Sequence, residues 1–231
     1  MNRRTKVSVK SHFTKFADWF ATIPFVMSLL MVAFAALPYS RDLRGEAKDR
    51  WITLLDGKSL DNWSPIGPAN WHLSGGAAVA DAYDRCLGQL IKLGCVNDGM
   101  GYLVSKNSYT DFEIHAEFWV SHDANSGVFF RCANSRLILT DNCYEANIFD
   151  ERPDQTYRTG AITLVAKPSV VINAGGKWNT YDITAQGAHL VLILNGTKTV
   201  DLQDSEHANG YIALQASGGT VKFRKVRIRS L

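Results

Sequence analysis

The segment D-F-E-I-H-A-E-F-W-V, residues 111–120, decides the fold class of this sequence. Apolar side chains occupy every second position and would share one face: Phe112, Ile114, Ala116, Phe118 and Val120. The opposite face would carry acidic, imidazole and indole groups: Glu113, His115, Glu117 and Trp119. A period of two is that of a β-strand. The segment therefore predicts a strand that packs on a core with one face only.

Similar short apolar segments recur after residue 50, and Gly, Asn, Asp and Pro separate them. They are residues 51–55, 101–105, 127–131, 136–139, 143–149, 160–165, 178–184, 189–194, 210–215 and 220–228. Many short strands between turn signals predict an all-β sandwich or barrel. The Asn195-Gly196 pair predicts a tight hairpin turn, and a change of phase in the last segment predicts a bulge near Arg224 and Lys225.

The N-terminal segment, residues 1–37, predicts export. Five basic residues and no acid lie within residues 1–15, and the uncharged stretch Trp19–Leu37 follows. This is the pattern of an export signal, with small residues for cleavage at 33–35. The stretch is also long enough for an uncleaved membrane-anchor helix, which takes roughly 17–25 residues. Both alternatives stay open, and both place the domain outside the cytoplasm. Residues 38–50 read as a polar linker, which leaves residues 51–231 as the folded domain.

The formal charge of +3 is concentrated in the N-terminal segment. Five of the 25 Lys and Arg residues and one of the 22 Asp and Glu residues lie in residues 1–36, so the remainder carries 20 basic and 21 acidic groups, a net charge of −1. A nearly neutral domain lacks the basic surface that nucleic-acid binding requires. The basic run F-R-K-V-R-I-R, residues 223–229, is typical of a solvated strand face. Nucleic acid is therefore excluded as a partner.

Four cysteines follow the apolar stretch, at Cys86, Cys95, Cys132 and Cys143. An even number in an exported chain favours disulfides, with three pairings open. Pairing of neighbours would close one loop, Cys86 with Cys95, and one hairpin, Cys132 with Cys143. A metal site is the alternative, but no C-x-x-C spacing and no His pair supports it. No cofactor is evident, and the sequence leaves a divalent metal open without supporting it.

The segment Y-E-A-N-I-F-D, residues 144–150, carries polar groups that a strand would not need for packing alone. Glu145 and Asn147 share a face, and Asp150 would point to the opposite face unless a bulge turns it. Two carboxylates about 5 Å or about 6.5–9.5 Å apart can cleave a glycoside, one as proton donor and one as nucleophile or base. The alternative is structural: Glu145 would form an ion pair with Arg131, and Asp150 would begin a turn.

Two further residues are candidates for sugar binding. Arg131 ends the segment G-V-F-F-R, where it would share a face with Phe129 and could hold either a carboxylate of the protein or an oxygen of a ligand. Trp178 begins a strand and could pack on a sugar ring. The alternative for Trp178 is a place in the sandwich core.

The ordered series of segments resembles the 3-keto-disaccharide hydrolase family. The segments that carry the resemblance are L-L-D-G-K-S-L-D-N-W, G-Y-L-V-S-K-N-S-Y-T-D-F-E-I-H-A-E-F, N-S-G-V-F-F-R, Y-E-A-N-I-F-D, T-G-A-I, K-W-N-T-Y-D-I, L-N-G and G-Y-I-A-L-Q…V-K-F-R-K-V-R-I. They run from about Trp51 to the C-terminus. The resemblance implies a concanavalin A-like jelly roll of two antiparallel sheets, near the β-glucanases, whose E-x-D-x-x-E strand has the spacing of Glu145, Asn147 and Asp150. It also implies a concave groove that meets sugar, and export to the bacterial periplasm or surface.

The implied reaction begins at a sugar ketone. A 3-keto group acidifies the proton on C2, so that a base can remove this proton, the anomeric oxygen can leave and water can add. On this resemblance, Glu145 would be the base or acid, Arg131 the group that stabilises the enolate, and Asp150 the second carboxylate. The residues expected to contact substrate are Asn147, Asn125 and Trp178, with Glu117 across the groove.

The chain departs from the family pattern at three places. Asn147 stands where a Gln is frequent, Arg152 stands in place of the His of a His-Pro-Asp sequence, and Ile162 replaces an aromatic residue after T-G-A. Three functions stay open: an exported hydrolase or lyase acting on 3-keto glycosides, a non-catalytic carbohydrate-binding module, and a structural domain of the cell envelope. Either of the first two would have carbohydrate as its partner, with a membrane contacted only through residues 1–37.

Overall fold

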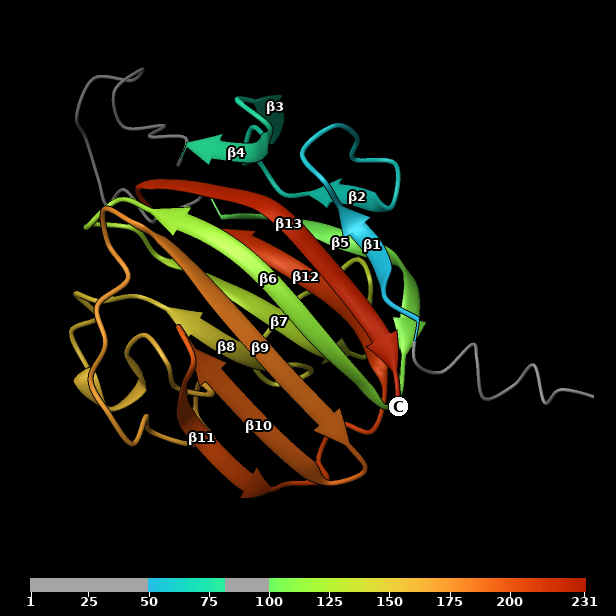
Figure 1. The fold of residues 1–231 in the computed structure, drawn as a ribbon, viewed down its shortest axis with the longest axis vertical. Coiled ribbons are helices and arrows are strands. Elements are labelled where there is room, and N and C mark those ends of the chain that lie inside the picture. The colour runs from blue at the N-terminus through green and yellow to red at the C-terminus, as the bar shows by residue number, and fades with distance from the viewer. Residues whose placement is uncertain (1–49, 82–99) are drawn as a thin grey trace, which may run out of the picture. The chain divides into compact units, whose positions relative to one another are not determined.

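A computed structural model describes residues 50–81 and 100–231. All regular structure in these ranges is β-strand, except for one short 3₁₀-helix at Gln155–Tyr157. The strands form two antiparallel sheets stacked as a sandwich (Figure 1). The predicted all-β class with two antiparallel sheets is confirmed. The signal or anchor helix expected in residues 1–37 lies outside the described residues, and no helix within them is long and apolar enough to cross a membrane.

The larger sheet has the strand order β11-β10-β9-β6-β13-β4-β3, and β1 pairs with the C-terminal part of β13. Its strands are β1 (Ile52–Leu55), β3 (His72–Ser74), β4 (Ala77–Asp81), β6 (Phe112–Val120), β9 (Trp178–Gln186), β10 (His189–Leu194), β11 (Thr197–Gln203) and β13 (Thr220–Ser230). The longest of them, β6, β9 and β13, lie side by side at the centre of the sheet (Figure 1).

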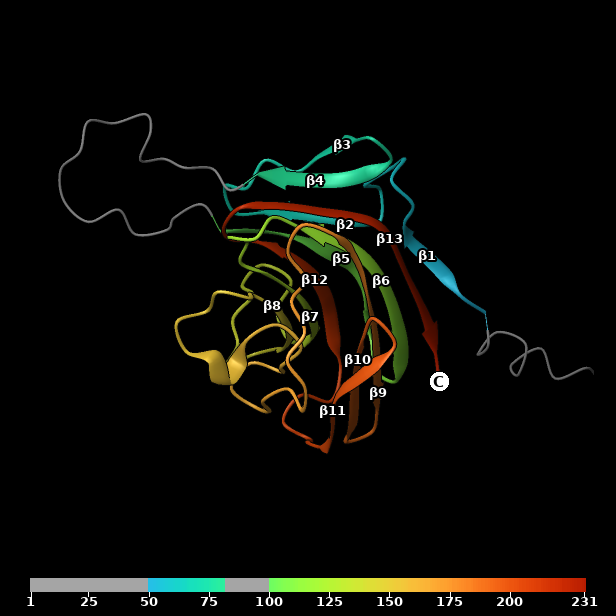
Figure 2. The same cartoon turned by 60° about the vertical axis from the view of Figure 1, so that its left-hand side comes forward.

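The smaller sheet has the order β2-β5-β12-β7-β8. Its strands are β2 (Trp63–Ile66), β5 (Gly101–Tyr109), β7 (Ser126–Cys132), β8 (Tyr144–Ile148) and β12 (Gly210–Ala216). Figure 2 shows β6 and β13 of the larger sheet bending around β12 and β7 of the smaller one. The outer face of the larger sheet is therefore its convex side.

The core between the sheets follows from the alternation in the sequence. All five apolar residues of the segment that predicted strand β6 are at most 2% exposed and belong to one buried cluster. The smaller sheet contributes Val128 and Phe130 from β7 and Ala146 from β8 to the same cluster. The residues that alternate with them face outward. Glu145 and Asn147 therefore belong to the outer face of the smaller sheet, and Glu117 to the outer face of the larger sheet.

Local features of the larger sheet also match the sequence. The pairing of β13 with β6 shifts register between Phe223 and Lys225, where a bulge was predicted. Asn195 and Gly196 have φ angles of 51° and 78° in the turn between β10 and β11, as a tight hairpin requires.

Two expected strands are loops instead. Residues 136–139 belong to the connection between β7 and β8, where the side chain of Asn142 accepts from the Leu139 amide and donates to the Leu137 carbonyl. These contacts replace strand pairing with side-chain hydrogen bonds. Residues 160–165 make only isolated bridges through Ile162, although they run along the edge strand β8.

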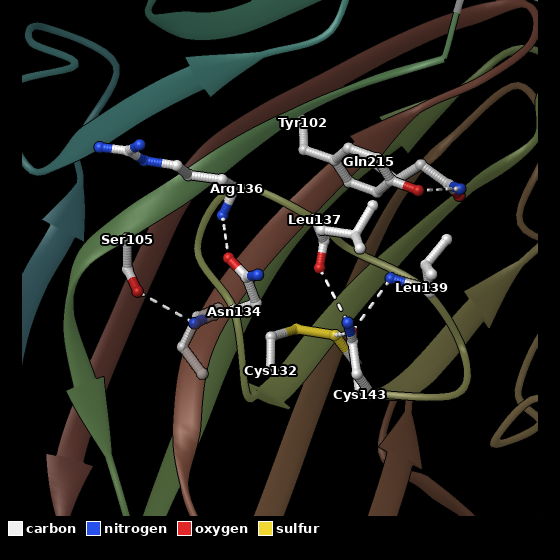
Figure 3. Close-up of a disulfide and its surroundings, with 11 residues drawn as sticks. Tyr102, Ser105, Cys132, Asn134, Arg136, Leu137, Leu139, Cys143 and Gln215 are labelled. Carbon is white, nitrogen blue, oxygen red and sulfur yellow. Dashed lines mark hydrogen bonds between the residues drawn. A yellow bond between two sulfur atoms is a disulfide. The ribbon is translucent and has the colours of Figure 1, made fainter.

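The disulfide between Cys132 and Cys143 closes the connection between β7 and β8 (Figure 3). This confirms the second of the two neighbour pairings. Cys86 and Cys95 lie outside the described residues.

Candidate functional site

Glu145 occupies the outer face of the smaller sheet, on edge strand β8. It pairs with Phe129 of β7, and its side chain leans over Gly127. A Cβ atom at Gly127 would lie only 2.8 Å from Glu145 Oε1. The glycine thus makes room for the carboxyl on a strand whose other residues carry side chains.

Tyr102 of β5 and Gln215 of β12 lie on the same outer face. They are directly paired in the sheet, and Gln215 Nε2 lies 3.5 Å from the Tyr102 hydroxyl (Figure 3). Both groups also donate to Met100 Sδ, over 3.0 Å from Tyr102 and 3.3 Å from Gln215. Gln215 Oε1 is buried and has no hydrogen-bond partner. The pair therefore offers a phenol and an amide oxygen on the face that carries Glu145.

Asn147 follows Glu145 on this face and is fully buried. Its amide nitrogen donates to the carbonyl of Tyr157, which fixes the side chain, and its Oδ1 has no partner. Asn147 Oδ1 and Gln215 Oε1 are thus two acceptors of the same sheet face that have no partner. A buried polar atom without a hydrogen bond costs free energy, so a ligand that donates to these two atoms would recover it.

Residues 160–166 cover the free edge of β8. The amide of Thr163 donates to the Glu145 carbonyl over 3.0 Å, and the amide of Asn147 donates to the Ala161 carbonyl over 3.0 Å. Through these hydrogen bonds Thr163 becomes the lateral neighbour of Glu145 at the edge of the sheet. The Thr163 hydroxyl lies close enough to the Glu145 carboxyl to lower its pKa, although it makes no hydrogen bond of regular geometry.

The direction of its pKa shift distinguishes Glu145 from the other carboxyl groups with a shifted pKa in residues 50–81 and 100–231. The residue is 5% exposed. Burial raises the pKa of its carboxyl from 4.5 to about 7, while the Thr163 hydroxyl and the positive charge of Arg152 act in the opposite direction. Burial also raises the pKa of Tyr102; the hydrogen bond from Gln215 lowers it, and the negative charge of Glu145 raises it further. A carboxyl with a pKa near neutrality can exchange protons at physiological pH.

Arg152 is the cation that acts on Glu145, and it was not among the expected site residues. It lies in the loop that follows β8 and is partly exposed, and its Nε has no hydrogen-bond partner. The sequence had marked this position only as a departure, an arginine where the resemblance implies a histidine.

Asp150 does not join Glu145. Its carboxylate accepts from the Thr159 hydroxyl at 2.6 Å and from the amides of Ala174 at 2.8 Å and Gly175 at 2.9 Å. No bulge turns it to the Glu145 face, so Asp150 keeps the direction that alternation gives it and anchors the loop before β9. The predicted pair of carboxylates on one face is wrong.

Arg131 lies at one end of the sandwich, and the prediction that it shares the outer face with Phe129 is wrong. Its φ is 53°, at a point where the pairing of β12 with β7 shifts register. The side chain is 1% exposed, and its guanidinium lies 6.0 Å from the centre of the core ring of Phe112. It donates over 2.7–3.1 Å to oxygen atoms of Thr110, Asp111, Gly187 and His207. Arg131 therefore ties three loops together, and its ion pair is with Asp111 rather than with Glu145.

Glu117 and Trp178 lie on the outer face of the larger sheet, on the other side of the sandwich from Glu145. Glu117 forms ion pairs with Arg224 at 2.6 Å and with Lys225 at 3.5 Å, and these interactions lower its pKa even though burial acts the other way. Trp178 is 39% exposed, and the Arg224 guanidinium lies 4.2 Å from its ring centre. The prediction that Glu117 faces Glu145 across one groove is wrong, and Trp178 lies on the same face as Glu117.

Asn125 lies beside the start of β7, in the smaller sheet. Its backbone pairs with Gly218, and its side-chain amide lies 3.5 Å from the Ser217 hydroxyl. It is on the same sheet as Glu145, but the contacts within the described residues tie it to the loop before β13.

A metal has no evident place in the described part of the chain. Within residues 50–81 and 100–231, no three His, Cys, Asp or Glu side chains lie close enough together to hold an ion. The candidate site as the structure assembles it consists of Glu145, Asn147, Tyr102, Gln215, Thr163 and Arg152.

Comparison with known proteins identifies the family. The sequence matches the 3-keto-alpha-glucoside-1,2-lyase-like domain over residues 50–229. The chain belongs to this family. No curated protein shows significant similarity to it.

Solved structures with a similar fold include two candidate glycosyl hydrolases from Parabacteroides distasonis. One is 18% identical and covers 83% of this chain and 97% of its own, with a TM-score of 0.63. The other is 24% identical and covers 79% and 100%, with a TM-score of 0.60. The carbohydrate-binding module CBM66 from Bacillus subtilis is 17% identical and covers 73% and 96%, with a TM-score of 0.54. At these identities the likeness shows the jelly-roll fold alone, which hosts both enzymes and binding modules.

Proposed function

We propose that the domain cleaves glycosides whose sugar carries a ketone at C3, and that Glu145 is the general base. The observation that carries the proposal is the Glu145 carboxyl, buried on the outer face of the smaller sheet with a pKa of about 7, in a chain that belongs to the 3-keto-alpha-glucoside-1,2-lyase-like family. A base with a pKa near the working pH is partly ionised and still accepts a proton readily.

The reaction would be an elimination followed by addition of water. Glu145 takes the proton from C2, and the electron pair of the C2–H bond becomes the second bond between C1 and C2. The bond between C1 and the glycosidic oxygen breaks with its electron pair on oxygen. The leaving group takes up a proton from solvent, and Glu145 releases to solvent the proton that it took from C2. Water then adds across the double bond, with hydroxyl at C1 and hydrogen at C2, and restores the 3-keto sugar.

This route needs one base rather than two carboxylates, in agreement with the position of Asp150. Ordinary glycoside hydrolysis requires a second carboxylate near the first, but Asp150 holds a loop instead. The elimination also needs a positive or hydrogen-bonding group near the oxygen of the enolate. Arg152 is the cation that already acts on Glu145, and we propose it for this role in place of Arg131.

The other polar groups of this face would orient the sugar. The Tyr102 hydroxyl can donate to a sugar oxygen when it gives up its hydrogen bond to Met100 Sδ. The unused acceptors Asn147 Oδ1 and Gln215 Oε1 can receive hydroxyl protons. These acceptors are buried, so the sugar could reach them only with a shift of the covering side chains.

Burial of the site also favours a second candidate, a carbohydrate-binding module without turnover. A carboxyl that is 5% exposed can serve as a fixed hydrogen-bonding group for a sugar without taking part in chemistry. The fold of CBM66 is compatible with this function but does not argue for it over catalysis.

Release of the leaving group from a 3-keto glucoside separates the two candidates. Purified wild-type protein and the Glu145→Gln variant would be compared, each with and without a chelator, and binding of the same sugar would be measured by calorimetry. Turnover by the wild type that is lost in the variant, with binding retained, supports catalysis. Saturable binding without turnover in either protein supports the binding module, and a loss of turnover with chelator would add a metal to the site.

We further propose that the domain acts outside the cytoplasm. The disulfide between Cys132 and Cys143 supports this proposal, because disulfides persist in oxidising compartments. Thiol labelling of protein taken from cells without reduction tests it: a protected Cys132–Cys143 pair agrees with export, and two free thiols would contradict it.

A further inference from the structure

Three separate segments that contact the candidate site carry exposed apolar side chains. Met100 precedes β5, Leu137 and Leu139 belong to the loop between β7 and β8, and Leu164 follows Thr163. Each of the four is between 41% and 58% exposed. We call these four residues the apolar rim.

Two contacts attach Met100 to the polar groups of the site. Its sulfur accepts from the Tyr102 hydroxyl and from Gln215 Nε2. The thioether therefore lies against the phenol and the amide proposed to contact the sugar, in a residue that is 41% exposed.

The loop that carries Leu137 and Leu139 is fixed on the same face. Ile138, between them, is buried in a cluster with Tyr102 and Phe129, and Phe129 is the neighbour of Glu145 in the sheet. The disulfide closes this loop (Figure 3). Hydrogen bonds of the Asn142 side chain to the backbone of Leu137 and Leu139 hold the loop in shape. The two leucines are thus presented on an ordered support beside the site.

Leu164 is held in an unfavourable backbone conformation. Its φ is 64°, a left-handed region that costs energy for any residue with a Cβ atom and that glycine or asparagine adopts more readily. It is also the most exposed member of the rim, and it directly follows Thr163, whose hydroxyl lies beside the Glu145 carboxyl. Backbone strain of this kind gathers at functional sites. Neither burial nor backbone preference accounts for a leucine here, whereas contact with a ligand would.

We propose that the apolar rim binds the leaving group, and that the preferred substrates are 3-keto glycosides with an apolar alkyl or aryl aglycone rather than 3-keto disaccharides. This inference rests on the proposed function. The polar atoms beside Glu145 suit the oxidised sugar, which carries hydroxyls and a ketone. The rim offers apolar carbon and sulfur, which gain from covering apolar surface and leave the hydroxyls of a second sugar unsatisfied.

Two substrates with similar leaving groups test the proposal, n-hexyl and methyl 3-keto-glucoside, together with a 3-keto disaccharide. Both simple alcohols leave as alkoxides of similar basicity, so the ratio of their kcat/KM values reports contact with the chain rather than chemistry. We expect the wild type to favour the hexyl substrate by about tenfold or more, the size expected for covering a few methylene groups. The disaccharide is compared by affinity for the Glu145→Gln protein, because a sugar hydroxyl is more acidic than a simple alcohol and leaves more readily. Its affinity should resemble that of the methyl glycoside.

Rim variants should reduce this ratio. Leu164→Gly removes the side chain and relieves the backbone, so the protein should unfold at the same or a higher temperature while the hexyl-to-methyl ratio falls by roughly fivefold. The double substitution of Leu137→Ser and Leu139→Ser should act in the same direction. Leu73→Ser is the matched control, an exposed leucine on β3 of the larger sheet, and should leave the ratio unchanged.

Binding keeps the test independent of turnover. Dissociation constants for the hexyl and methyl compounds would be measured on Glu145→Gln protein, with and without the rim substitutions. Tighter binding of the hexyl compound that the rim variants abolish supports the rim, even if the wild type shows no turnover and the proposed reaction fails. Equal affinity and equal kcat/KM for the two compounds, tighter binding of the disaccharide than of the hexyl compound, or a hexyl preference that the rim variants leave intact would overturn the proposal.

Discussion

Replacing Glu145 with Gln should change how the stability of the domain depends on pH. The carboxyl is 5% exposed, and burial raises its pKa from 4.5 to about 7. The folded and unfolded values thus differ by about 2.5, and at about 1.4 kcal/mol for each pKa unit this corresponds to about 3 kcal/mol.

The sign follows from which state binds the proton. Between pH 4.5 and 7, the unfolded chain has released the proton of Glu145 while the folded protein still holds it. The wild type therefore loses about 3 kcal/mol of folding free energy from this group as the pH rises through this interval, and the contribution is constant below and above it. Glutamine does not titrate, so the folding free energy of the variant does not fall in this way as the pH rises. The free energy of unfolding of the wild type minus that of the variant should fall by about 3 kcal/mol between pH 4 and pH 8.

Urea unfolding followed by tryptophan fluorescence at a series of pH values measures this difference. Leu73→Ser serves as the control, because it changes no titrating group and its difference from the wild type should not vary with pH. A difference between wild type and Glu145→Gln that is the same at pH 4 and pH 8 would refute the reasoning. So would a difference that grows with pH, since this would mean that Glu145 is held as a paired carboxylate.

Three further results are expected. The kcat/KM for a 3-keto glucoside should rise through about pH 7 and level off above it, because Glu145 must be ionised to act as a base; a fall over the same range would make it an acid instead. Arg131→Met should destabilise the domain by about 3 kcal/mol, because it removes a buried cation that makes several hydrogen bonds. The kcat of the folded protein should not change. A loss of kcat in fully folded protein without urea would mean that Arg131 takes part in the reaction. Replacing Cys132 and Cys143 with Ser should cost about 3 kcal/mol for a loop of this length, and an unchanged urea midpoint would contradict a stabilising role.

The sequence was sufficient for features that depend on local pattern. Strict alternation in residues 112–120 predicted both faces of β6, and the Asn195-Gly196 pair predicted the hairpin turn, because each requires only neighbours in the chain. Glu145 and Asn147 were found for the same reason: two residues at period two share a face wherever the strand lies.

The sequence was insufficient where a backbone angle or a distant strand decides the position of a side chain. Arg131 follows a regular apolar strand segment, and no residue near it in the sequence predicts its φ of 53° or the register shift beside it. Glu117 was expected to face Glu145 because alternation predicts that each side chain lies on an outer face. Alternation does not predict which of the two sheets the strand belongs to. Tyr102 and Gln215 meet only through the pairing of β5 with β12, strands more than a hundred residues apart, and no single segment could have shown this pair.

The most direct test of the central claim, that Glu145 removes the C2 proton of a 3-keto glycoside, is to run the reaction in deuterium oxide and examine the product by NMR. Elimination and addition of water should place deuterium at C2 of the released 3-keto sugar, at the rate of cleavage and above the exchange seen without protein. The Glu145→Gln variant should neither cleave nor exchange. Cleavage that leaves the C2 proton in place would show that the glycosidic bond breaks by direct displacement, and would contradict the account.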